Sequence, residues 1–117
     1  MNVKEYYSIT GGNYEEVLAR LGKEERIVKY LKRFADDTNY FEEFLSAFNN
    51  EDYETAFRTV HNIKGLALNL GIPSLFKSVD PLCEAIRHGK PEFDVSELIT
   101  GLKDIYENTV SCAKQID

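Results

Sequence analysis

The chain has 117 residues, of which 43% are hydrophobic and 29% are charged, a composition that predicts one folded domain over 1–117 and excludes an intrinsically disordered chain. Its formal net charge is −6 without an extended cluster of lysine and arginine, so protein partners are expected rather than nucleic acid. No apolar run approaches the ~18 residues that span a bilayer, and the N-terminal sequence MNVKEYYSIT lacks the apolar core of a signal peptide. We therefore expect a cytoplasmic protein without a membrane partner.

Helical periodicity dominates the sequence, and the alternation typical of strands is not sustained. A short helix is predicted from Asn13 to Gly22, because Asn13 and Glu16 form a capping-box pair and glycine ends many helices. One long amphipathic helix is predicted next, ending near the sequence NNED at 49–52, because its inward positions recur at alternating steps of four and three. This stripe, with one polar interruption, consists of Ile27, Leu31, Phe34, Thr38, Phe41, Leu45 and Phe48.

Two further helices are predicted in the middle of the chain. The first runs from about Asp52 to Gly71 with the same spacing of apolar residues, and the glycine marks its end. The second has Pro73 in its first turn, where proline is well tolerated. It also contains Pro81, at which a kink or a break is expected, and Gly89 closes it.

The last predicted helix begins with Asp94 and Glu97 as a second capping pair and continues to Ile116. Four long apolar stripes with short connections must be buried against one another. The predicted fold is therefore all-α, an antiparallel four-helix bundle with a short extra N-terminal helix. Cys83 and Cys112 lie within apolar helical patterns and outside any metal or dithiol motif, so reduced core cysteines are expected.

A histidine lies on the flank of the third predicted helix. Because His61 follows an inward-facing valine, it is rotated by about 100° from the buried stripe and can reach water. At helical spacing from it are Phe57 at minus four, Lys64 at plus three, Gly65 at plus four and Leu68 at plus seven. These five residues therefore share one face, and the interior glycine costs the helix about 1 kcal/mol relative to alanine.

This face has the chemistry of a phosphoryl acceptor. An imidazole is a competent nucleophile towards phosphorus at neutral pH, and the ammonium of Lys64 can neutralise a phosphoryl group added to His61. The absent side chain at Gly65 leaves room for that group and for the surface that delivers it. Phe57 and Leu68 could form an apolar docking patch for another protein, or could be ordinary boundary residues of the bundle.

The segment HNIKGLALNLG, which runs from His61 to Gly71, resembles the H-x-x-K-G-x-x-x-x-x-G signature of histidine-containing phosphotransfer (HPt) domains. The resemblance extends through DYETAFRTVHNIKGLALNLGIPSL and implies a helical phosphocarrier of two-component phosphorelays. By this resemblance His61 is the phosphorylated residue, Lys64 the cation that stabilises the phosphate, and Gly65 the residue that gives access. The partners are then receiver domains, and magnesium belongs to the receiver, so that this chain needs no cofactor of its own.

The chain departs from the pattern of many HPt domains at two places. Leu66 follows the lysine-glycine pair where a small hydroxyl residue is common. A glutamate or glutamine that hydrogen-bonds the imidazole is also common, and its position falls on Cys83, with Glu84 next. Glu84 is therefore the candidate for orienting His61.

Other functions are weighed against phosphotransfer. Glu84 and His88 are four residues apart, but a metal site needs more ligands than this pair supplies, and no metal is expected. No nucleotide-binding loop or catalytic triad is present in the sequence, so the protein would be a phosphocarrier without autonomous kinase activity. The alternative is a helical interaction module that binds receivers or other signalling proteins and transfers nothing. A monomer is expected in either case.

Overall fold

A computed structural model describes residues 1–37 and 39–117, except the side chain of residue 37, and every regular element in these ranges is an α-helix. In chain order the helices are α1 (Val3–Thr10), α2 (Tyr14–Leu21), α3 (Glu24–Asp37), α4 (Tyr40–Asn49), α5 (Tyr53–Asn69), α6 (Pro73–Ala85) and α7 (Ser96–Ala113). The all-α prediction is confirmed for this part of the chain. None of the described helices is both long enough and apolar enough to cross a bilayer.

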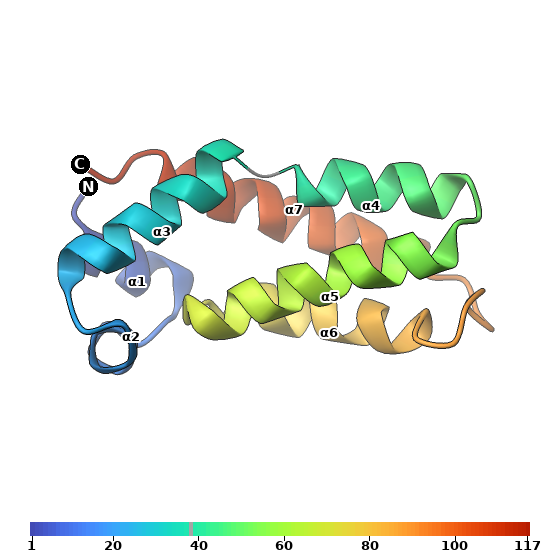
Figure 1. Cartoon of the computed structure of the whole chain (residues 1–117), viewed down its shortest axis with the longest axis horizontal. Helices are drawn as coiled ribbons and strands as arrows, with labels where there is room; N and C mark the ends of the chain where they lie inside the picture. Colours follow the sequence, from blue (N-terminus) through green and yellow to red (C-terminus); the bar gives the residue numbers. More distant parts are fainter. Residues whose placement is uncertain (38) are drawn as a thin grey trace.

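The last four helices lie along the long axis of the molecule, which measures 41 × 22 × 21 Å, and successive helices run in opposite directions (Figure 1). α4 packs on α5, α5 on α6, and α6 on α7. The ring centroids of Phe41 on α4 and Tyr106 on α7 are 6.1 Å apart, which connects the first of these helices to the last. α3 packs against α7 as well, and α1 and α2 lie at the end of the molecule that holds both termini (Figure 1).

The core is formed by the apolar stripes that the sequence predicts. On α5 the buried residues follow the four-three spacing, and the same holds on α6 and α7. Burial of such stripes is the main source of stability for helices of this length. The largest fully buried side chains include Phe44, Ile27, Leu31, Ile63, Leu75, Leu82, Ile86 and Leu102.

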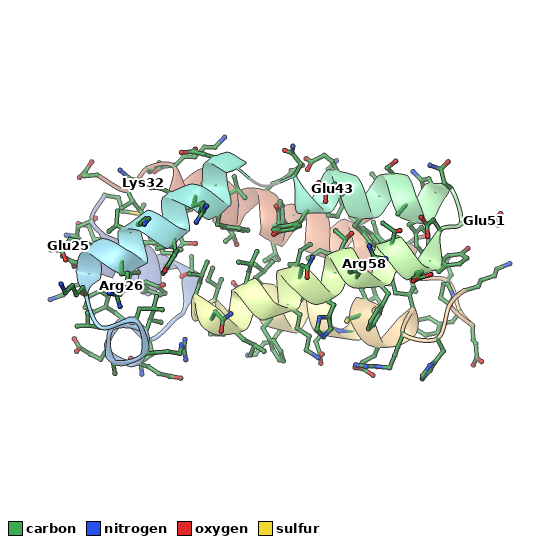
Figure 2. All side chains as sticks on the ribbon, in the orientation of Figure 1. Glu25, Arg26, Lys32, Glu43, Glu51 and Arg58 are labelled. Atoms are coloured by element: carbon green, nitrogen blue, oxygen red, sulfur yellow. The ribbon has the colours of Figure 1, made fainter. Side chains whose placement is uncertain are left out.

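Charged side chains lie on the outside of the molecule, as expected for solvated helix surfaces. Figure 2 shows Arg26 and Lys32 on α3, Glu43 on α4 and Arg58 on α5, and all four are exposed.

The single long helix predicted between Gly22 and the sequence NNED at 49–52 is wrong, because α3 ends at Asp37 and α4 begins at Tyr40. Thr38 of the predicted stripe lies outside the described residues. The sequence DDTN at 36–39 accounts for the interruption: Asp, Asn and Thr are poor helix formers that favour caps and turns. The four-three spacing runs through this tetrapeptide unchanged, and so it conceals the break.

The N-terminal region contains two short helices where one was predicted. The predicted helix is α2, which the Asn13 side chain caps by accepting a hydrogen bond from the backbone of Glu16 at 3.1 Å. α1 was not predicted. The Asn2 side chain caps it in the same way, by accepting a hydrogen bond from the backbone of Glu5 at 2.9 Å. It ends at Gly11 with a left-handed φ of 77°. The buried residues of α1 are Val3, Tyr6, Tyr7 and Thr10.

α6 continues through Pro81 to Ala85, so the helix does not break at the proline. Its buried residues lie on both sides of the proline, and this packing maintains the helix despite the lost backbone donor.

The predicted capping pair of the last helix, Asp94 with Glu97, is wrong. Asp94 accepts a hydrogen bond from the backbone of Ser96 at 2.9 Å, while Glu97 lies in the first turn of α7 without completing a box.

The cysteines are both free, Cys83 in the core and Cys112 half-buried.

α1 and α2 cover the C-terminal end of α5. The Tyr7 hydroxyl donates a hydrogen bond to the carbonyl of Leu70 at 2.6 Å, and Arg20 Nη2 donates to the carbonyls of Leu68 and Asn69, each at 3.0 Å. These bonds satisfy carbonyls that the last turn of a helix leaves without intrahelical partners. The helix that carries His61 is therefore anchored at this end by contacts distant in sequence.

Gly12→Ala is expected to lower the free energy of unfolding by about 1–3 kcal/mol, as overpacking does. A Cβ at Gly12 would lie 2.4 Å from the carbonyl oxygen of Gly71 and 2.7 Å from Cδ1 of Tyr7. Urea unfolding measures the change, and Gly101→Ala is the matched control because a Cβ there meets nothing within 4 Å. Equal stability of Gly12→Ala and the parent would contradict the close approach of Gly12 to Gly71 and Tyr7.

Candidate functional site

α5 is the helix that presents the candidate site. The Asp52 side chain caps its first turn by accepting a hydrogen bond from the backbone of Thr55 at 3.2 Å. Val60 and Ile63 are fully buried, and His61 is exposed beside them. The exposure that the sequence predicts for His61 is thus what the structure shows.

The imidazole of His61 lies against an aromatic ring. The ring centroids of Phe57 and His61, one helical turn apart on α5, are separated by 5.7 Å with an interplanar angle of 40°. The guanidinium carbon of Arg87 is 5.5 Å from the centroid of the same Phe57 ring, within the range of a cation–π contact. Phe57 therefore connects His61 on α5 to a cation that follows α6.

The ammonium of Lys64 is in an ion pair across the α5–α6 interface. Its Nζ lies 2.8 Å from Oδ1 of Asp80 and 5.8 Å from the ring centroid of Phe76, both on α6. The hydrogen bond with Asp80 raises the pKa of Lys64, so the side chain is a full cation at neutral pH. The two side chains are 22% and 36% exposed, and so water and other ligands can reach the pair.

Open space lies beside Gly65. A Cβ built at this position meets no heavy atom within 4 Å other than its own helix and chain neighbours, and its φ is not in the left-handed region. Neither packing within the chain nor backbone conformation therefore requires glycine here. The sequence predicts free space at Gly65, and no side chain of a neighbouring helix fills the position of its missing Cβ.

Two apolar side chains were predicted to flank His61 along the same helix face. Leu68 is 52% exposed, whereas Phe57 is half-buried under the cation of Arg87. Leu68 lies two turns from His61 along α5, and its role in docking a partner stays a prediction. Leu66, which replaces the small hydroxyl residue common in the HPt pattern, is half-buried.

Glu84, the candidate for orienting His61, is paired with Arg87. Arg87 Nε donates a hydrogen bond to Oε2 of Glu84 at 3.2 Å, and Nη2 donates to Oε1. This pair lowers the pKa of the Glu84 carboxyl. No hydrogen bond joins Glu84 to His61 among the residues that the structure describes, so the orienting role stays a prediction.

Cys83 occupies the position at which many HPt domains place the hydrogen-bonding glutamate or glutamine. It is fully buried, and burial raises the pKa of its thiol. A neutral buried thiol is a weak hydrogen-bond donor, so it is a poor substitute for a carboxylate or amide.

Asp80 and Arg87 are the residues of this region that the sequence analysis missed. Asp80 lies on α6 and pairs with Lys64. Arg87 follows α6, pairs with Glu84 and contacts the Phe57 ring. Asp80 is four residues after Phe76 and four before Glu84, and this spacing along one edge of α6 is the signal that could have indicated it.

These features define a helical domain with an exposed histidine on α5, a paired lysine one turn later and open space at the following glycine. A family model described as the Hpt domain matches residues 29–111, and the chain belongs to that family. The match covers all of α4, α5 and α6 and leaves α1 and α2 outside it. Hpt domains act in phosphotransfer within phosphorelays and interact with receiver domains. No curated protein and no solved structure matches this chain.

Proposed function

We propose that this protein accepts a phosphoryl group on His61 from the phosphorylated aspartate of one receiver domain and passes it to another receiver. The observation that carries the proposal is the position of His61: an exposed imidazole on α5, one turn from a cation and beside open space at Gly65. A nucleophile held on a rigid helix is already positioned for attack when a receiver docks.

The proposed step is a displacement at phosphorus. The lone pair of an unprotonated imidazole nitrogen forms a P–N bond, while the P–O bond to the aspartate breaks and the carboxylate leaves with that electron pair. The reverse displacement by a second aspartate restores the imidazole. Lys64 neutralises part of the phosphoryl charge, and any magnesium is held by the receiver, so the chain itself uses no cofactor and no nucleotide.

The docking surface in this proposal is the apolar face around His61. Phe57 and Leu68 contact the receiver, and α4 to α7 form the antiparallel four-helix bundle that holds them in place. A single chain contains every residue of the site, and we propose that it acts as a monomer. The cytoplasmic location stays a prediction.

Transfer from a labelled receiver tests the proposal. Receiver domains carrying labelled aspartyl phosphate and magnesium are mixed with the protein, and label on this chain is tested for the acid lability and alkali stability of phosphohistidine. We expect such label to appear within the time of mixing for at least one receiver. Stable binding of receivers without any label would instead support an interaction module that transfers nothing.

Lys64→Ala is expected to slow acceptance of the phosphoryl group from a receiver roughly tenfold, as the loss of one charge-assisted hydrogen bond would. The helix should be unaffected, since alanine is a strong helix former. Rapid-quench kinetics measures the rate, and Lys103→Ala, an exposed lysine on α7, is the matched control. An unchanged rate in Lys64→Ala would remove the electrostatic role from this residue.

A further inference from the structure

Two of the cations near His61 are paired with carboxylates of α6. Lys64 pairs with Asp80 at 2.8 Å, and Arg87 pairs with Glu84, four residues after Asp80. The first pair joins two helices, whereas the second lies within one segment. The ammonium assigned to the phosphoryl group is therefore already partnered in the unmodified protein.

We propose that Asp80 is a positioning residue that competes with the phosphoryl group on His61 for the ammonium of Lys64, and so shortens the lifetime of the phosphohistidine. This inference rests on the proposed function of His61. Asp80 makes the phosphoryl group easier to pass on, because a less stabilised phosphohistidine is a better donor to the next aspartate.

Geometry supports competition for the same cation. Lys64 and His61 are three residues apart on α5, where side chains lie about 5–6 Å apart at Cβ, so a phosphoryl group on His61 is within reach of the lysine. Asp80 approaches the same ammonium from α6. The ammonium has three donors and one positive charge, which a carboxylate and a nearly dianionic phosphoryl group must share.

The environment of the pair keeps this competition effective. Lys64 is only 22% exposed and Asp80 36%, so the interaction is screened less than one between fully exposed side chains. The Phe76 ring, whose centroid is 5.8 Å from Nζ, also keeps the ammonium near α6. Removal of the Asp80 charge would leave Lys64 with the phosphoryl group as its main anionic partner.

Asp80→Asn tests the proposal, because it removes the charge with almost no change in shape. The protein is phosphorylated with phosphoramidate, a small donor that needs no receiver. The donor is then removed, and loss of the phosphoryl group is followed by intact-protein mass spectrometry. We expect the half-life to increase about two- to fivefold, the range for a partly exposed ion pair. Asp104→Asn, at an exposed position of α7, is the control and should leave the half-life unchanged.

A double mutant separates positioning from a general charge effect. In a Lys64→Ala background, Asp80→Asn should no longer lengthen the half-life, because the cation through which it acts is gone. An equal increase in both backgrounds would overturn the proposal, since Asp80 would then act by direct repulsion. Asp80→Ser gives a second variant with the same expectation if the asparagine destabilises α6.

The outcomes distinguish this inference from the proposed function. If the parent becomes phosphorylated on His61 and Asp80→Asn has the same or a shorter half-life, the competition is contradicted and the function of His61 stands. If neither phosphoramidate nor a phosphorylated receiver modifies His61 in the folded parent, both proposals are contradicted.

Discussion

His61→Gln is expected to reduce phosphoryl acceptance to background. Glutamine is a good helix former without a nucleophilic nitrogen, so the change removes the chemistry and leaves the helix. His61 is exposed on α5, so the loss of its side chain opens no cavity in the core. Circular dichroism should therefore show unchanged helicity while transfer of label from a receiver disappears.

The control for this variant is the other histidine of the chain. His88 is exposed in the turn after α6, and His88→Gln should accept label at the parent rate. If label survives in His61→Gln and is lost in His88→Gln, the phosphorylated residue is His88 and the assignment to His61 is contradicted.

Gly65→Gln is expected to separate stability from transfer. Glycine inside a helix costs roughly 0.5–1 kcal/mol relative to alanine, and glutamine is also a good helix former, so the free energy of unfolding should stay the same or rise. The new side chain would enter the open space beside His61. Displacement of the approaching phosphoryl group by about 1 Å can lower the rate roughly 100-fold.

Gly101→Gln is the matched control for this separation. Gly101 also lies inside a helix, α7, and a Cβ there meets nothing within 4 Å. Its stability should change by a similar amount, with no change in the transfer rate. Normal transfer by Gly65→Gln, measured with the same receiver, would show that the open space is not used.

The position of the candidate site could be predicted because it depends on one helix alone. Asp52 and Gly71 mark the ends of the segment, and the burial of Val60 and Ile63 follows from spacing. Once that face is buried, the helical rotation places His61 at the surface. Local signals are sufficient where a single element sets the geometry.

The partners of the site could not be predicted in the same way. The Lys64–Asp80 pair depends on the rotation and register of α6 against α5, and periodicity within either helix leaves both undetermined. The contact of Arg87 with Phe57 likewise comes from the turn after Ala85, which brings the chain back beside α5. The resemblance to HPt domains indicated Glu84 as the residue that orients His61 and did not reveal its pair with Arg87.

The errors in helix boundaries have separate causes. The break between α3 and α4 falls in a run of cap-forming residues that leaves the apolar spacing intact. α1 has a capping residue and a terminal glycine, so its local signals were present. Its role in covering the end of α5 through Tyr7 and Leu70 became visible only in three dimensions.

A two-receiver relay tests the central claim most directly. The protein is labelled by one phosphorylated receiver, separated from it, and mixed with a second receiver and magnesium, and the label on each chain is followed in time. The proposed function predicts that label leaves His61 and appears on the aspartate of the second receiver, and that His61→Gln breaks the relay at its first step. Label that never enters this chain, or that reaches the second receiver equally well through His61→Gln, would contradict it.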